Sequence, residues 1–191
     1  MSRIDISFLK DMADSLRRPF HENYLSMYSS VFGGITTDPV MMMVPVDDHL
    51  VHRGDGVFEV FKCVNGSIYN LKAHLDRLKH SAETLGFNAD IVSDPKTQEI
   101  VKETIRAGKK ENCLIKFIIS RGPGSLGVNP YDCPKNELYI MVTTLAESFM
   151  SLHPNGAKMI TSSITAKIPF FATVKSCNYL INVLMQKEAS E

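Results

Sequence analysis

An Asn65-Gly66 pair between two apolar runs is the feature that most constrains the fold of this chain. Residues 57–64 and 67–71 flank the pair, and Asn-Gly in such a place is the strongest short-range signal for a two-residue hairpin turn. Leucines then recur at helical spacing through residues 72–85, and Gly86 stands where it can end that helix. The stretch therefore predicts a β-hairpin followed directly by a helix.

The remaining patterns extend this order of strands and helices. Strands are predicted over residues 25–35, which Gly33-Gly34 breaks, and over 40–46, 113–120, 137–144 and 157–165. A second helix is predicted over 95–109, where Ser93-Asp94-Pro95 marks its start. The run at 40–46 is nearly continuous in apolar residues, which is typical of a strand buried on both faces. Mixed strands and helices with a hairpin indicate an α+β fold up to about residue 147.

The expected domain organisation is a small N-terminal α/β domain over residues 1–147, a linker over 148–156, and the beginning of a second domain over 157–191. The last segment offers one strand and one helix, which cannot bury a core alone. At the other end, Ile4, Phe8, Met12 and Leu16 fall on one helical face, which we expect to dock on the body of the protein.

The charge balance excludes several classes of partner. The chain has 191 residues with 21 basic and 21 acidic side chains, so nothing suggests binding to nucleic acid or to an anionic membrane. No apolar run approaches the roughly 20 residues that span a bilayer.

The four cysteines form no Cys-x-x-Cys pair and are interpreted as free thiols in a reducing compartment. Acidic residues near the N-terminus argue against a transit peptide.

Two polar motifs have more than one interpretation. His49-x-x-His52 beside Asp47 and Asp48 has a spacing that metal sites use, but no third ligand follows at a diagnostic distance, so no metal site is predicted. The glycine-rich segment 122–127 offers backbone amides to an anion, yet it lacks the Lys-Ser/Thr ending of a phosphate-binding loop. A structural turn is the alternative for both.

Lys175 and Arg77 are the cations with a chemical interpretation. Lys175 lies between Pro169 and an apolar helical pattern, so a loop-to-helix junction is predicted there. A helix N-terminus and apolar neighbours favour the uncharged amine, the form that attacks a carbonyl. Arg77 lies on the helix after the hairpin and carries a fork of donors suited to phosphate. The alternatives are an exposed lysine at a helix start and a surface arginine paired with a neighbour.

Together these stretches resemble the class IV aminotransferases, the fold-type IV pyridoxal phosphate (PLP) enzymes. The motifs that carry the resemblance, in register from about Met27 to the last residue, are His52-Arg-Gly-Asp-Gly-Val-Phe-Glu59, the Asn65-Gly66 hairpin, His74-Leu-Asp-Arg-Leu78, Arg121-Gly-x-Gly-x-x-Gly-Val-Asn-Pro130 and Lys175-Ser-x-Asn-Tyr-Leu. The group includes D-amino acid aminotransferases, branched-chain aminotransferases and aminodeoxychorismate lyases. The segment 27–56 looks closest to the plant-type D-amino acid branch.

The resemblance implies roles for the matching residues. Lys175 would form the Schiff base with PLP and shuttle the proton, Arg77 would bind the cofactor phosphate, and Tyr179 would lie beside the cofactor ring oxygen. Phe58 and Glu59 would line the substrate pocket. PLP chemistry needs an uncharged amine and a fixed cation for the phosphate, so these residue types agree with the implied chemistry.

Three departures from the family pattern bear on function. Arg53 stands where relatives carry an aromatic residue, and Lys116 stands where they often carry an arginine, so both are candidates for holding a substrate carboxylate. For Arg53 the alternative is an outward side chain paired with Asp47, Asp48 or Asp55. Family members also continue beyond the lysine helix, so the resemblance implies a chain that ends early in its second domain.

The function implied by the resemblance is PLP-dependent transamination between an amino acid, of the D- or branched-chain type, and a 2-oxo acid. A homodimer and a cytoplasmic location are expected, with a plastid as the alternative if a targeting segment is missing. The alternative functions are an aminodeoxychorismate lyase type of PLP reaction and a non-catalytic truncated homologue. The glutamate at position 59 favours the transaminase over the lyase.

Overall fold

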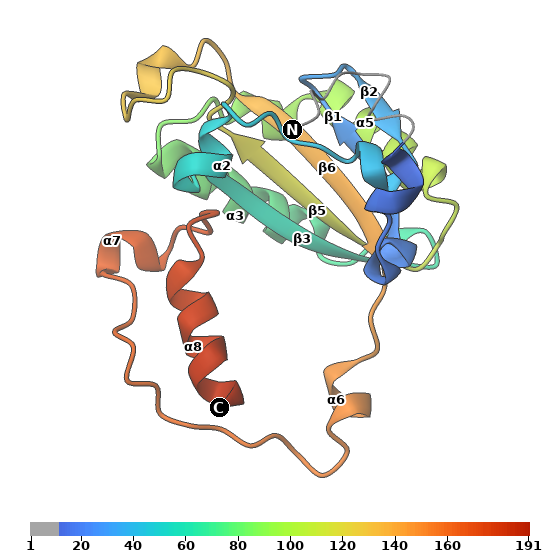
Figure 1. Cartoon of the computed structure of the whole chain (residues 1–191), viewed down its shortest axis with the longest axis vertical. Helices are drawn as coiled ribbons and strands as arrows, with labels where there is room; N and C mark the ends of the chain where they lie inside the picture. The colour runs from blue at the N-terminus through green and yellow to red at the C-terminus, as the bar shows by residue number, and fades with distance from the viewer. Residues whose placement is uncertain (1–11) are drawn as a thin grey trace.

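A six-stranded antiparallel sheet forms the centre of the computed structural model, which describes residues 12–191 (Figure 1). Its strand order is β2-β1-β6-β5-β3-β4. The strands are β1 (Tyr24–Ser29), β2 (Gly34–Thr36), β3 (Gly56–Val64), β4 (Ser67–Ile68), β5 (Cys113–Ser120) and β6 (Glu137–Thr144). The three long strands β3, β5 and β6 are adjacent, so they provide the rigid platform for the rest of the chain.

Helices and short 3-10 turns connect these strands. The α-helices are α2 (His49–Arg53), α3 (Leu71–Thr84), α4 (Asp90–Ser93), α5 (Pro95–Ala107), α6 (Phe149–Leu152), α7 (Pro169–Ala172) and α8 (Leu180–Ser190), and the 3-10 turns are η1 (Pro19–Asn23), η2 (Pro39–Met41) and η3 (Pro130–Asp132). The predicted long helices are confirmed. Asp94 accepts a hydrogen bond from the amide of Lys96 at the start of α5, and Gly86 follows α3 with a φ of +69°.

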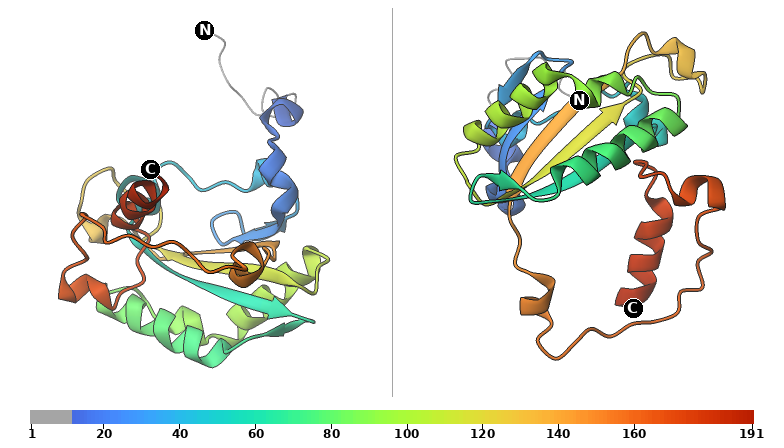
Figure 2. Two further views of the ribbon diagram at one scale, coloured as in Figure 1. Left: turned by 90° about the horizontal axis from the view of Figure 1, so that it is seen from below. Right: turned by 180° about the vertical axis from the view of Figure 1, so that it is seen from behind.

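The core lies between one face of the sheet and the two long helices. Figure 2 shows α3 and α5 along one side of the sheet and α8 on the other side. Side chains that alternate along β3 and β5, such as Val57, Phe61, Ile115 and Phe117, are buried under the helices. The alternate side chains, such as Phe58 and Lys116, therefore point to the face that α3 and α5 leave uncovered.

The hairpin at Asn65-Gly66 is as predicted. Asn65 has a φ of +50° and Gly66 a φ of +73°, so both central residues of the turn adopt the left-handed region that the favoured two-residue hairpin needs. Cys63 then pairs with Ile68 and Val64 with Ser67. The turn brings the chain into α3, which begins at Leu71.

Two predicted strands are wrong. Residues 40 and 41 belong to η2, which the Asp38 side chain caps, and no strand follows at 42–46. Pro45 lacks the N–H that a sheet ladder needs, and Val46 is 73% exposed. Residues 157–165 form no strand and lie apart from the sheet, where the described chain offers them no neighbouring strand to pair with (Figure 1).

The predicted N-terminal amphipathic helix lies mostly outside the described residues. The part of it that the structure describes, residues 12–16, is helical. None of the helices in the described part of the chain is long and apolar enough to cross a lipid bilayer.

Two glycines allow the C-terminal segment to approach the start of β3. A Cβ on Gly54 would lie 3.0 Å from both the Cα and the amide nitrogen of Asn178, and Gly54 has a φ of +63°. A Cβ on Gly56 would lie 3.0 Å from the carbonyl oxygen of Ile119 and 3.3 Å from the sulfur of Cys177. Glycine is therefore needed at positions 54 and 56, because a side chain at either position would collide with neighbouring chain segments.

We expect Gly54→Ala to destabilise the protein more than Gly66→Ala does. Both positions have a positive φ, which costs a non-glycine residue about 1–2 kcal/mol. Only Gly54 has a neighbour, because a Cβ at Gly66 would meet nothing within 4 Å. The contact with Asn178 should add about 1–3 kcal/mol to the loss at Gly54. Urea unfolding of the two variants measures the difference, and equal losses would contradict the close approach of the two segments.

Candidate active site

The backbone around Lys175 pairs with the first residues of β3, as a short additional strand would. The amide of Phe58 donates to the carbonyl of Lys175 at 3.0 Å, and the amide of Cys177 donates to the carbonyl of Gly56 at 2.7 Å. Val57 and Ser176 form an isolated antiparallel bridge between these bonds. Lys175 thus lies in a short extended segment before α8, rather than in the first turn of that helix.

The side chain of Lys175 lies against two aromatic rings. Its Nζ atom donates to the Tyr179 hydroxyl at 3.1 Å and lies 4.4 Å from the centroid of the Phe58 ring. The rings of Phe58 and Tyr179 meet edge-to-face, with centroids 5.2 Å apart. Three of the residues that the sequence singled out therefore form one cluster, although Phe58 is far from the other two in the chain.

Two further lysines surround the same aromatic pair. The Lys116 ammonium, on β5, lies 4.9 Å from the Phe58 centroid, so this predicted site residue joins the cluster. The Lys167 ammonium lies 5.1 Å from the Tyr179 centroid. Sequence reasoning missed Lys167, and its position before Pro169 carries no distinctive signal. The cluster is strongly cationic, which suits a ligand with negative charges.

Arg77 is held on α3 by a buried carboxylate. Its Nε donates to Glu59 Oε1 at 2.6 Å and its Nη2 to Glu59 Oε2 at 2.8 Å, which is a bidentate ion pair. His74 Nδ1 lies 2.6 Å from Glu59 Oε2. The Glu59 side chain is 0% exposed, whereas that of Arg77 is 52% exposed. The arginine therefore has one edge fixed and the other edge free to meet a ligand.

The charge state of Glu59 follows from these partners. Burial raises the pKa of its carboxyl group, but the hydrogen bonds and positive charges of Arg77 and His74 outweigh that effect and hold the pKa below the ordinary value of 4.5. Glu59 is accordingly an anion at neutral pH. Its expected place in the wall of a substrate pocket stays a prediction, and in this structure its carboxylate is turned to Arg77 and His74.

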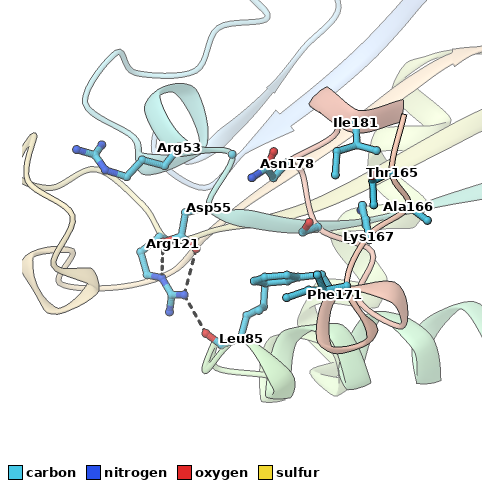
Figure 3. Close-up of a pocket in the computed structure, with 13 residues that line it drawn as sticks. Arg53, Asp55, Leu85, Arg121, Thr165, Ala166, Lys167, Phe171, Asn178 and Ile181 are labelled. Atoms are coloured by element: carbon cyan, nitrogen blue, oxygen red, sulfur yellow. Dashed lines mark hydrogen bonds and ion pairs between the residues drawn. The ribbon is translucent and has the colours of Figure 1, made fainter. Parts of the chain in front are cut away.

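Arg53 lies at the edge of a cavity of about 560 Å³ next to the Lys175 segment (Figure 3). The cavity lining includes Arg121, Lys167, Phe171 and Asn178. The Arg53 guanidinium points away from Asn178, and its Nη2 donates to the carbonyl of Leu126 in the glycine-rich loop. In the part of the chain described, Arg53 forms no ion pair with Asp47, Asp48 or Asp55.

Arg121 joins three segments that surround this cavity. Its Nε and Nη2 donate to both oxygens of Asp55 at 3.0 and 3.1 Å, and its guanidinium also donates to the carbonyls of Leu85 and Gly86. The guanidinium stacks 3.9 Å from the centroid of the Phe87 ring. This side chain therefore ties the Gly54-Asp-Gly56 turn and the end of α3 to the end of β5.

A buried polar cluster fixes the glycine-rich loop. Asp48, which is fully buried, accepts from Ser120 at 2.7 Å and from the Tyr139 hydroxyl at 2.6 Å. Burial and the Asp48 charge raise the pKa of Tyr139, so its hydroxyl stays a donor. His49, also buried, has its Nε2 2.7 Å from the carbonyl of Ser125. The His49-x-x-His52 motif is thus part of a short helix that anchors this loop.

Comparison with known proteins identifies the family to which a chain with this sheet belongs. The family model described as amino-transferase class IV matches residues 56–191, and the chain belongs to this family. The chloroplastic D-amino-acid transaminase of Arabidopsis thaliana is 42% identical over 172 residues, which cover 88% of this chain and 44% of that protein. A putative branched-chain-amino-acid aminotransferase of Methanocaldococcus jannaschii is 32% identical, over 77% of this chain and 50% of that protein.

Solved structures share the fold. The T.th. branched-chain amino acid aminotransferase with pyridoxamine 5'-phosphate superposes with a TM-score of 0.71 at 24% identity, over 87% of this chain and 56% of that one. A 4-amino-4-deoxychorismate lyase from Pseudomonas aeruginosa gives a TM-score of 0.63 at 21% identity, over 78% and 54%. The predicted family and fold class are confirmed. The chain spans about half the length of the curated relatives it matches.

Class IV aminotransferases use PLP, a phosphorylated aromatic aldehyde, and the residues of this chain fit such a group. The Lys175 amine beside the Phe58 and Tyr179 rings suits an aromatic aldehyde. The half-exposed Arg77 has an Nη1 that makes no hydrogen bond within the described chain, which suits a phosphate. The expectation that Arg77, Lys175 and Tyr179 hold the cofactor stays a prediction, with which this chemistry agrees.

We expect the Glu59–Arg77 pair to make stability depend on acidic pH. Because the pKa of Glu59 is lowered on folding, its contribution is complete above pH 4.5 and is lost as the pH falls through the lowered folded-state value. Glu59→Gln should reduce the free energy of unfolding at neutral pH by about 1–3 kcal/mol. It should also lose less stability than the wild type between about pH 6 and about pH 3.

Urea unfolding at several pH values measures both effects. Glu99→Gln is the matched control, since Glu99 is exposed on α5. Parallel pH profiles for the wild type and Glu59→Gln would contradict an ionised Glu59 in the folded protein.

Proposed function

We propose that this chain carries the lysine-bearing part of a PLP-dependent aminotransferase, which exchanges an amino group between an amino acid and a 2-oxo acid. The observation that carries the proposal is the Lys175 amine beside Phe58 and Tyr179, with a half-exposed arginine on the adjoining helix. Bound PLP supplies the reactive carbonyl and the electron sink that this chemistry needs.

Three residues of this chain have separate roles in the proposed reaction. Lys175 Nζ would take the proton from the α-carbon of the amino donor and deliver it to the cofactor. Of the three lysines around the aromatic pair, it is the one that bonds to the Tyr179 hydroxyl and lies nearest the Phe58 ring. The Tyr179 hydroxyl orients that amine through the 3.1 Å hydrogen bond. Arg77 binds the phosphate with the edge that Glu59 leaves free.

The substrate contacts are proposed from position and charge. Phe58 forms an apolar wall, and Lys116 meets a substrate carboxylate on the open face of the sheet. Arg53 is a second contact for a carboxylate, which requires its guanidinium to leave the Leu126 carbonyl. We propose a D-amino acid or a branched-chain amino acid as the donor, which the names of the two relatives at 42% and 32% identity support.

The organisation of the protein is proposed along the same lines. We propose that residues 1–147 form the small domain, 148–156 the linker and 157–191 the first part of a second domain. The exposed apolar residues of α7 and α8, such as Phe170, Leu180 and Val183, support a further packing partner for that segment. We also propose a homodimer, in the cytoplasm or, as the name of the Arabidopsis relative suggests, in a plastid.

The first test concerns Lys175. Borohydride reduction of the protein mixed with PLP should fix the cofactor covalently on Lys175, which peptide mass mapping detects. Lys175→Arg should lose the adduct, whereas Lys187→Arg, on the exposed side of α8, should keep it. An adduct that is mainly on Lys116 or Lys167 would contradict the assignment.

The second test concerns Arg77 and must allow for its buried partner. Arg77→Ala alone would remove the bidentate partner of the buried Glu59 and leave only His74 beside it, which costs about 3–5 kcal/mol of stability. The informative comparison is Glu59→Gln against Glu59→Gln/Arg77→Ala, in which no buried charge is left unpaired. The double variant should bind PLP about ten- to a hundredfold more weakly, equivalent to about 1.5–3 kcal/mol.

Fluorescence titration with PLP measures this difference, and circular dichroism confirms that both variants are folded. Arg106→Ala in the Glu59→Gln background is the matched control, since Arg106 is an exposed arginine near the end of α5. Equal PLP affinity in the single and double variants would refute the role of Arg77.

A further inference from the structure

We propose that Ser81 is a positioning residue for Lys175, and this inference rests on the proposed function. The Lys175 main-chain N–H donates to the Ser81 hydroxyl oxygen at 3.1 Å. Ser81 is 0% exposed and lies on α3, 94 residues away in the sequence. A buried hydroxyl from a distant helix thus accepts the hydrogen bond of the residue that carries the reactive amine.

Ser81 completes a two-sided hold on the Lys175 backbone. On the other side, the carbonyl of Lys175 accepts from the amide of Phe58 at 3.0 Å. The N–H and the carbonyl of Lys175 are therefore fixed by two different elements, α3 and β3. With both groups fixed, the direction of the Cα–Cβ bond is set, and the amine can move only through the side-chain torsions.

The position of Ser81 on α3 relates the lysine to Arg77. The two residues are four positions apart and lie on the same side of the helix, about 6 Å apart along its axis. Arg77 is in turn fixed by Glu59 on β3. One helical turn of α3 therefore sets the separation between the reactive amine and the cation that is proposed to hold the phosphate.

The chemistry of the position explains why a hydroxyl is needed there. The neighbours of Ser81 on the buried face of α3, Leu78 and Ala82, are apolar. Within the described residues, Ser81 Oγ has no other hydrogen-bond partner than the Lys175 amide. An alanine at this position would leave that amide without an acceptor, and an unpaired backbone amide is costly away from water.

The experiment compares Ser81→Ala and Ser81→Thr with the wild-type chain. The first readout is amide hydrogen exchange at Lys175, followed by NMR without any cofactor. Exchange at Lys175 should rise up to about tenfold in Ser81→Ala, because one hydrogen bond of about 1 kcal/mol is lost there. The amide of Ile119, in the central sheet, should be unchanged. Ser81→Thr keeps the hydroxyl and should restore protection.

The second readout is the rate at which PLP and borohydride label Lys175. This rate should fall about tenfold in Ser81→Ala and recover in Ser81→Thr. Ser26→Ala is the matched control, because Ser26 is also fully buried and its hydroxyl bonds to the Thr104 carbonyl at 2.6 Å, within the α5 side of the fold. It should leave exchange and labelling at Lys175 unchanged.

Each outcome decides the proposal. Unchanged exchange and labelling in a folded Ser81→Ala variant would overturn it, as would an equal effect of Ser26→Ala. If the wild type itself shows no label on Lys175, the proposed function fails, while the exchange measurement still decides whether Ser81 holds the lysine backbone. If Ser81→Thr does not fold, the comparison between the two alanine variants remains decisive.

Discussion

The pairing of the Lys175 segment with the first residues of β3 is the interaction on which the site depends. Two backbone hydrogen bonds and the Val57–Ser176 bridge bring a lysine from the end of the chain onto the edge of the sheet. The approach is possible because Gly54 and Gly56 have no side chains to block it. Without this pairing, Phe58 and Lys175 would have no reason to meet, since the sequence separates them widely.

A second constraint is the use of buried charge. Glu59 places a carboxylate on the helix-covered face of the sheet, which is costly unless its oxygens are fully bonded. Arg77 and His74 on α3 satisfy that need, and the ion pair fixes the guanidinium where part of it still reaches solvent. The hydrogen bonds from Arg77 and His74 thus offset the cost of burying Glu59, and the same bonds fix the position of the Arg77 guanidinium. The cationic cluster around Phe58 lies on the opposite face of the sheet.

Prediction from the sequence succeeded where the signal was local. The hairpin at Asn65-Gly66 and the helix beginning at Pro95 were found because their turn and cap residues act over a few positions. It failed for residues 40–46 and 157–165, which are apolar or strand-like in composition. A strand exists only where another strand pairs with it, and composition does not reveal that partner.

Residue types at fixed spacing were enough to predict the family and the fold class, and they also singled out Lys175 and the arginine on α3 as candidate site residues. Only the tertiary structure decided that Glu59 binds Arg77, that Lys167 joins the cluster, and that Ser81 accepts the Lys175 amide. These contacts join residues far apart in the chain. Their geometry is set by how α3 and the last segment pack against β3, which no local pattern encodes.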